Sequence, residues 1–197
     1  MPHIVIISSS VRRERKSHHV ALYLKNYLEE NNLSTAEILD LKVYKFPIFE
    51  DTIKTLQNPS EEVLDFANKV KLADGIIIVT PEYNGSFPAS LKNVVDLLYD
   101  EWHGKPISIS TVSAGVFGGS QALVSLQFTL WKIGAWTVTN MFPVPNVTKA
   151  FDDKGNPSDK EATDKLADVY VKELLECVRV NKQAAMTKRI LTVVNAM

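Results

Sequence analysis

An unbroken apolar run that ends in a polar, aromatic-bearing loop constrains the fold of this chain most. Ile76–Val79 is β-branched throughout, which is typical of a strand covered by helices on both faces. Pro81 ends the strand, Asn84 and Gly85 favour a turn, and apolar residues recur at helical spacing over 91–98. The loop is therefore expected at the carboxyl edge of a sheet, where open α/β sheets bind ligands.

A second informative loop, 8–17, follows the apolar run Ile4–Ile7, which predicts a first buried strand. Serine hydroxyls, three arginines and a lysine lie together there, just before a helix with apolar residues on one face. Free N–H groups and the dipole of a helix N-terminus favour an anion, and arginine and serine donate to phosphate oxygens. The alternative is a solvated basic turn in which a serine caps the helix.

A third loop, 113–121, follows the predicted strand Ile107–Val112 and contains Gly115, Gly118 and Gly119. Glycines between a strand and a helix let the backbone approach a ligand closely. The loop lacks the Gly-Lys-Ser/Thr of a Walker loop and the spacing of the dinucleotide fingerprint. On its own it indicates either a ligand-closing loop or a tight turn.

Five strands alternating with helices predict an α/β fold, a doubly wound parallel sheet in three α/β/α layers. Residues 36–41 and 137–142 supply the remaining strands, and Ser158 with Glu161 forms a capping box before a last helix. The flavodoxin-like order 2-1-3-4-5 brings the three informative loops to one crevice. We expect a single domain over 1–182. The tail 183–197 is either a helix extension packed on a partner subunit or a frayed end.

The loop that begins Pro81-Glu82-Tyr83-Asn84-Gly85 and runs to Asn93 resembles the flavin-ring loop of the NADPH-dependent FMN reductases. The first loop resembles that family's phosphate loop, although Ser9 and Glu14 stand where the family pattern has glycine. The resemblance implies FMN as the cofactor. It implies that the phosphate is bound by Ser10, Arg12, Arg15 and Ser17. It implies that the flavin ring is bound by Pro81, Glu82, Tyr83, Asn84 and Gly85. The far rim of the ring is then expected to be lined by Ser113, Gly115, Gly118 and Gly119.

The activity that the resemblance implies is an FMN-dependent NAD(P)H oxidoreductase, with NADPH or NADH as transient co-substrate. A small acceptor (quinone, azo compound, chromate or free flavin) would take the electrons in a second half-reaction. Because the cofactor carries the chemistry, no catalytic side chain is expected. A flavodoxin-type electron carrier and a non-catalytic regulatory protein of the same fold remain as alternatives.

The composition of the chain limits which binding partners can be expected. A formal charge of −1 gives no indication of nucleic-acid binding, and no apolar run approaches a membrane span. The single Cys177 excludes an internal disulfide and a cysteine-rich metal site, and we expect a cytoplasmic protein. We also expect a homodimer or homotetramer, as the family resemblance suggests, because Phe46, Ile48, Phe49 and Trp102 exceed what one small core needs.

Overall fold

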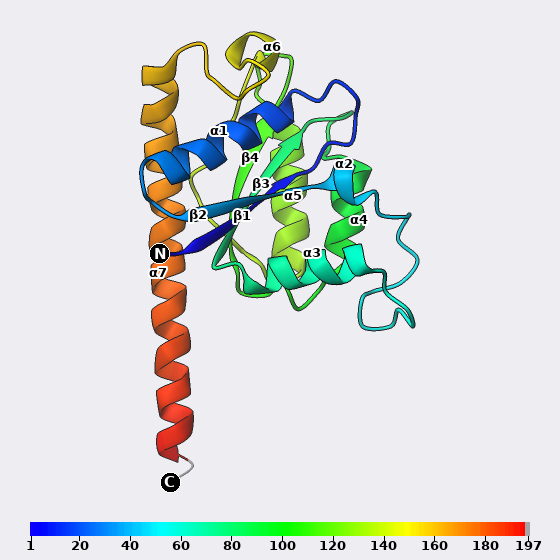
Figure 1. Cartoon of the computed structure of the whole chain (residues 1–197), viewed down its shortest axis with the longest axis vertical. Coiled ribbons are helices and arrows are strands. Elements are labelled where there is room, and N and C mark those ends of the chain that lie inside the picture. The colour runs from blue at the N-terminus through cyan, green and yellow to red at the C-terminus, as the bar shows by residue number, and fades with distance from the viewer. Residues whose placement is uncertain (196–197) are drawn as a thin grey trace.

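The computed structural model describes the backbone of residues 1–195 and the side chains of residues 1–188. A five-stranded parallel sheet forms its centre, and the strand order is β2-β1-β3-β4-β5 (Figure 1). The strands are β1 His3–Ser8, β2 Thr35–Asp40, β3 Gly75–Pro81, β4 Pro106–Val112 and β5 Trp136–Thr137. This order is the predicted flavodoxin-like one.

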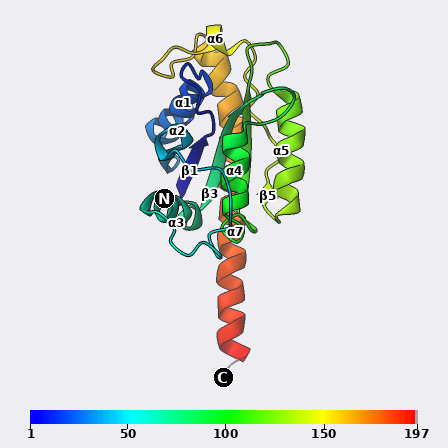
Figure 2. The same cartoon turned by 90° about the vertical axis from the view of Figure 1, so that its right-hand side faces the viewer.

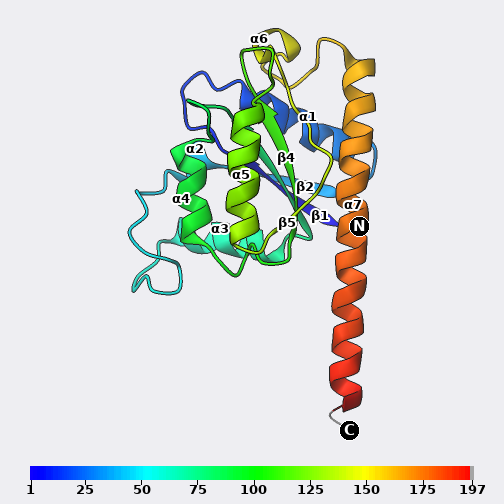
Figure 3. The ribbon, with the colours of Figure 1, turned by 180° about the vertical axis from the view of Figure 1, so that it is seen from behind.

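Helices cover both faces of the sheet. They are α1 Ser17–Glu30, α2 Leu41–Tyr44, α3 Glu61–Leu72, α4 Ala89–Leu97, α5 Ser120–Lys132, α6 Val147–Ala150 and α7 Lys160–Asn195. Ile4 and Ile6 of β1 face the core shared with α1 and α7, whereas Val5 and Ile7 face the core shared with α3, α4 and α5. Figure 3 shows α4 and α5 in front of the sheet. The central strands β1 and β3 are apolar on both faces because each face is buried.

The fifth strand is shorter than the sequence predicts, since Trp136–Thr137 replaces the expected 137–142. The chain still bonds to β4: the N–H of Val138 donates to Ile107 O at 2.9 Å and that of Phe142 to Ile109 O at 3.2 Å. Four residues of this segment thus match two residues of β4. The intervening residues 139–141 are exposed and bulge out of the ladder, whereas Val138 and Phe142 on either side of them are buried.

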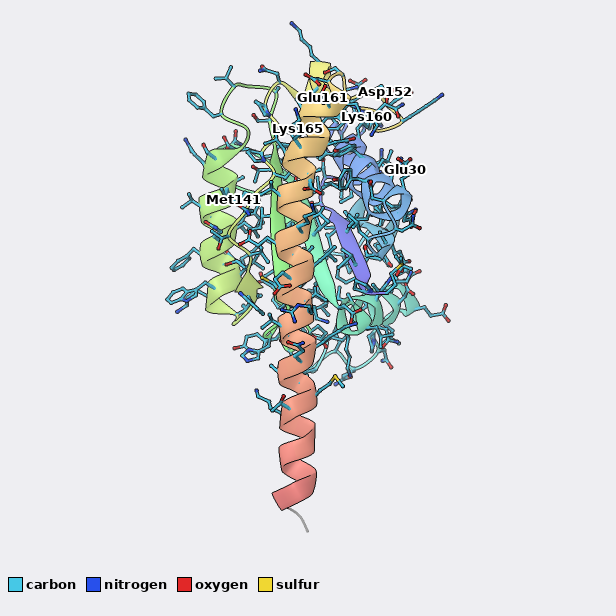
Figure 4. All side chains as sticks on the ribbon, turned by 90° about the vertical axis from the view of Figure 1, so that its left-hand side faces the viewer. Glu30, Met141, Asp152, Lys160, Glu161 and Lys165 are labelled. Atoms are coloured by element: carbon cyan, nitrogen blue, oxygen red, sulfur yellow. The ribbon has the colours of Figure 1, made fainter. Side chains whose placement is uncertain are left out.

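Helix α7 is much longer than the other helices and its C-terminal part projects beyond the body of the protein (Figure 2). Its first part packs in the core through Tyr170, Leu174 and Val178, and Lys182 reaches Asp74 at 2.7 Å. The helix N-cap is Asp159, whose carboxylate accepts from the N–H of Ala162 at 3.0 Å. The expected capping box on Ser158 is therefore wrong by one residue. Figure 4 views this side, with Lys160, Glu161 and Lys165 labelled near the beginning of α7.

Trp102 was expected at an interface and instead lies wholly inside the core, with 0% of its surface exposed. Phe46 likewise packs inward, with its ring stacked on Tyr44 and edge-on to Phe66. Ile48, by contrast, is 87% exposed. No helix within residues 1–195 is both long and apolar enough to cross a bilayer.

Candidate functional site: a cavity at the carboxyl edge of the sheet

A cavity of about 370 Å³ lies at the carboxyl edge of the sheet, between the loops that follow β1, β3 and β4. Eight residues expected at the site line it: Ser10, Arg12, Arg15, Ser17, Pro81, Glu82, Tyr83 and Ser113. Five others do not: Asn84, Gly85, Gly115, Gly118 and Gly119. Three loops that are far apart in sequence therefore meet at one place, as the predicted strand order requires.

The first and second loops are tied together by Tyr83. Its hydroxyl is hydrogen-bonded to the Oγ of Ser10 at 2.7 Å, and the guanidinium of Arg12 lies 5.6 Å from the centre of its ring. The guanidinium is also exposed at the cavity rim. Tyr83 thus closes the phosphate loop on one side and positions a cation by cation–π attraction.

The N-terminus of α1 fits a phosphate. The Oγ of Ser17 is buried and has no hydrogen-bond partner within the described chain, although Ser17 lines the cavity. No side chain caps this helix, and its first turn carries no acidic residue. Unpaired donors at a helix N-terminus favour an anion. Ser9 occupies the family's glycine position without strain, because its φ is not among the positive values of the chain.

Arg15 was expected to bind the phosphate, but its guanidinium is already engaged by other residues of the chain. Its guanidinium makes a two-pronged ion pair with Asp40 at the end of β2, and it also donates to Ser10 O at 3.0 Å. The side chains of Arg15 and Asp40 are only 11% and 13% exposed. Arg15 therefore braces the backbone of the first loop, and Asp40, which holds Arg15 beside the cavity, is a residue that sequence reasoning missed. Its position at the end of a strand beside the first loop was the available signal.

The pair with Arg15 also sets the protonation of Asp40. Burial alone would raise the pKa of this carboxyl, but the hydrogen bond from Arg15, the backbone N–H of Lys42 at 3.0 Å and the charge of Arg15 outweigh burial and hold the pKa below its usual range. Asp40 is therefore ionised at neutral pH.

His18 lies behind the same loop, with Nδ1 at 3.0 Å from the Oγ of Ser8 and 3.9 Å from Asp40. Burial, and then the positive charge of Arg15, lower the pKa of His18 in spite of the opposing effect of Asp40. His18 is therefore neutral at pH 7.

Glu82 connects the second and third loops. Its carboxylate accepts from the N–H groups of Gln121 and Ala122, at 2.9 and 3.2 Å, in the first turn of α5. This contact supplies the missing cap of α5 and places a negative charge at the positive end of its dipole. The carboxylate of Glu82 thus fixes the spacing of the two loops.

The turn at Asn84 and Gly85 has the expected left-handed backbone, with φ of 51° and 75°. Tyr83 and Ser86 pair on either side of it through two backbone hydrogen bonds of 2.8 and 3.1 Å. The N–H groups of Asn84 and Gly85 have no acceptor within the described chain. They are free to donate to a ligand that lies over the turn.

The glycine loop is a tight turn at its end. Gly118 and Gly119 have φ of 60° and 84°, and a Cβ on Gly119 would lie 2.9 Å from the Cβ of Thr111. The hydroxyl of Thr111 donates to Gly118 O at 2.7 Å and that of Ser113 to Gly115 O at 2.9 Å. Both glycines are buried away from the cavity, so here the geometry favours the tight-turn alternative over direct contact.

The sheet order and the anion-ready first loop define a flavodoxin-like α/β protein. The model of the NADPH-dependent FMN reductase family matches residues 2–149, and the chain belongs to this family. It is therefore a flavin-dependent NAD(P)H oxidoreductase with FMN as cofactor, which confirms the expectation from the sequence.

Individual relatives agree. The NAD(P)H-dependent FMN reductase LOT6 of Saccharomyces cerevisiae is 35% identical over 138 residues, which are 64% of this chain and 71% of the yeast protein. A NADPH azoreductase of Bacillus sp. is 29% identical over 181 residues, 91% of this chain and 94% of the relative. The solved structure of FerB, a flavoenzyme NAD(P)H:(acceptor) oxidoreductase from Paracoccus denitrificans, superposes with a TM-score of 0.75 at 22% identity, covering 92% of this chain and 99% of FerB.

Proposed function

We propose that the protein binds FMN in the cavity at the carboxyl edge and uses NAD(P)H to reduce a small acceptor such as a quinone or an azo compound. Bound FMN would supply the redox chemistry of this reaction, as acceptor of a hydride and donor of two electrons. The relatives named as quinone reductases and azoreductase support this acceptor class. The observation that carries the proposal is the convergence of three loops on one cavity with unpaired donors.

The phosphate is held in this proposal by Arg12, Ser10 and Ser17 together with the N-terminus of α1. Arg12 supplies a free cation, whereas Arg15 acts through the Ser10 carbonyl that it braces. Glu14 also lines the cavity and is exposed, so its carboxylate can remain in solvent.

Residues 81–85 would hold the ring, with Pro81, Glu82 and Tyr83 lining the cavity. The free N–H groups of Asn84 and Gly85, just beyond this lining, would be available to donate to the edge of the ring, and such donors would stabilise negative charge that develops during reduction. Ser113 lines the cavity on the side of the third loop and would form the far rim with Ala114. No side chain of this chain needs to transfer a proton.

Titration of the purified protein with FMN and with riboflavin, followed by absorbance and fluorescence, tests the cofactor site. FMN should bind far more tightly than riboflavin because only FMN carries the phosphate. Equal affinity for the two flavins would contradict the assignment of the first loop.

We further propose that the working unit is a homodimer or homotetramer. Val124, Phe128 and Trp131 recur at helical spacing on the outer face of α5 and are 67%, 62% and 67% exposed, an apolar stripe that a second copy would cover. Light scattering should give a multiple of 22.0 kDa, and Phe128→Glu should reduce it. A monomeric mass for the native chain would contradict this.

The FMN-binding domain is taken to span 1–182, with 183–197 as an extension that is helical through Asn195. We further propose that the protein acts in the cytoplasm.

A further inference from the structure

A second cavity, of about 630 Å³, lies outside the proposed flavin site. It is enclosed by α2, the segment that follows α2, and the first turn of α4. Its wall includes Val11, Lys42, Lys45, Phe46, Ile48 and Asn93. Its size is in the range of small-molecule sites.

The two cavities share the first loop as a common wall. Val11 lines the second cavity, whereas its neighbours Ser10 and Arg12 line the first. The hydroxyl of Ser90, at the beginning of α4, donates to Ser9 O at 2.6 Å and fixes this wall to α4. A long ligand that meets the flavin could therefore extend from one cavity toward the other.

The outer wall of the second cavity is held in place by Asn93. Its side-chain N–H donates to Pro47 O at 2.7 Å, and its carbonyl oxygen accepts from the N–H of Phe49 at 2.6 Å. Phe46 is stacked on Tyr44, with ring centres 5.2 Å apart. The apolar wall is therefore formed before a ligand arrives.

The charge in this cavity has one sign. Lys42 and Lys45 line it and no carboxylate does. The ammonium of Lys42 reaches only Arg13 O at 3.4 Å, and that of Lys45 has no hydrogen bond or ion pair within the described chain. Two available cations beside an apolar wall suit a ligand that has a flat ring and a phosphate group close to that ring.

We propose that this cavity binds the adenosine 2′-phosphate end of NADPH, with Lys42 and Lys45 on the phosphate and Phe46, Pro47 and Ile48 against the adenine. The inference rests on the proposed function, because it assigns the remote end of that reaction's co-substrate. NADH lacks the 2′-phosphate, so the two lysines make the enzyme selective for NADPH.

Binding of nucleotide fragments to the FMN-saturated protein tests this directly. With FMN in excess the first loop is occupied, so a second phosphate must bind elsewhere. Calorimetry should show adenosine 2′,5′-bisphosphate binding at least about 10-fold more tightly than adenosine 5′-monophosphate. The Lys42→Met/Lys45→Met variant should lose that difference. The control Lys71→Met/Lys165→Met removes the same charge from exposed helix faces and should keep it.

Steady-state kinetics supply the second readout. The Lys42→Met/Lys45→Met variant should raise KM for NADPH about 10-fold or more and leave KM for NADH and both kcat values near wild type. Equal binding of the two fragments to the wild type, or an unchanged preference in the variant, would overturn the assignment. A failure of the proposed function is distinguishable, because FMN would then fail to bind in the saturation step.

Discussion

The ion pair between Asp40 and Arg15 gives the sharpest mutational test of how the phosphate loop is built. Asp40→Asn keeps the side chain's shape and an oxygen to cap α2 at the N–H of Lys42, but it removes the charge that faces Arg15. Breaking a fully buried pair costs ~3–5 kcal/mol, because the remaining charge is left without a partner. Since this pair borders an open cavity, we expect a loss of about 2–3 kcal/mol in the free energy of unfolding of the apoprotein.

Bound FMN should reduce the loss of stability caused by Asp40→Asn. The freed guanidinium of Arg15 lines the cavity and can pair with the incoming phosphate, so saturating FMN should recover about 1 kcal/mol or more of the lost stability. Chemical denaturation at pH 7, with and without FMN, measures both quantities. The control Asp65→Asn weakens an exposed pair with Lys69 and should cost under about 1 kcal/mol.

The pH dependence follows from the lowered pKa of Asp40. A carboxyl whose pKa is lower in the folded state contributes stability above its unfolded pKa of about 3.9, and that contribution disappears as pH falls through the folded value. The wild type and Asp40→Asn should therefore converge in stability below about pH 4. An Asp40→Asn apoprotein as stable as wild type at pH 7, or an equal loss with and without FMN, would refute this reasoning.

Three further predictions concern neighbouring residues. Arg12→Ala should weaken FMN binding by about 10- to 150-fold, since a charged hydrogen bond is worth ~1.5–3 kcal/mol; unchanged affinity in a fluorescence titration would remove Arg12 from the site. Gly85→Val puts a β-branched residue at φ 75°, with its Cβ 2.6 Å from the Oε1 of Gln121. We expect this variant to retain FMN and to show slower reduction of the flavin by NADPH. Reduction at the wild-type rate would show that the turn does not face the ring. Burial lowers the pKa of His18, so its contribution to stability should be complete above its unfolded pKa of about 6.5 and decline as pH falls through the folded value; His18→Gln should flatten that slope in denaturation measurements.

The sheet and the meeting point of the loops were predictable from the sequence because they depend on local signals. The apolar run Ile76–Val79 could only be a strand buried on both faces, and the loops after β1, β3 and β4 had to reach the same edge. The positive φ at Gly85 likewise follows from an Asn-Gly turn.

The contacts made within the site were less predictable because they join residues distant in sequence. Asp40 lies 25 residues from Arg15, and Glu82 lies 39 residues from Gln121, so neither pairing leaves a local pattern. Trp102 was misplaced for the same reason: it belongs to a buried core cluster whose members come from several distant helices and strands, and its neighbours in sequence are polar. The shortening of β5 results from the bulge at residues 139–141, which lies between the buried Val138 and Phe142.

Anaerobic stopped-flow mixing of the FMN-loaded protein with NADPH tests the central claim most directly. The flavin's visible absorbance band should bleach in a single-turnover reaction, and a quinone added afterwards should restore it. Bleaching that requires added free FMN and never involves the bound flavin would contradict the account, as would FMN that binds and is not reduced.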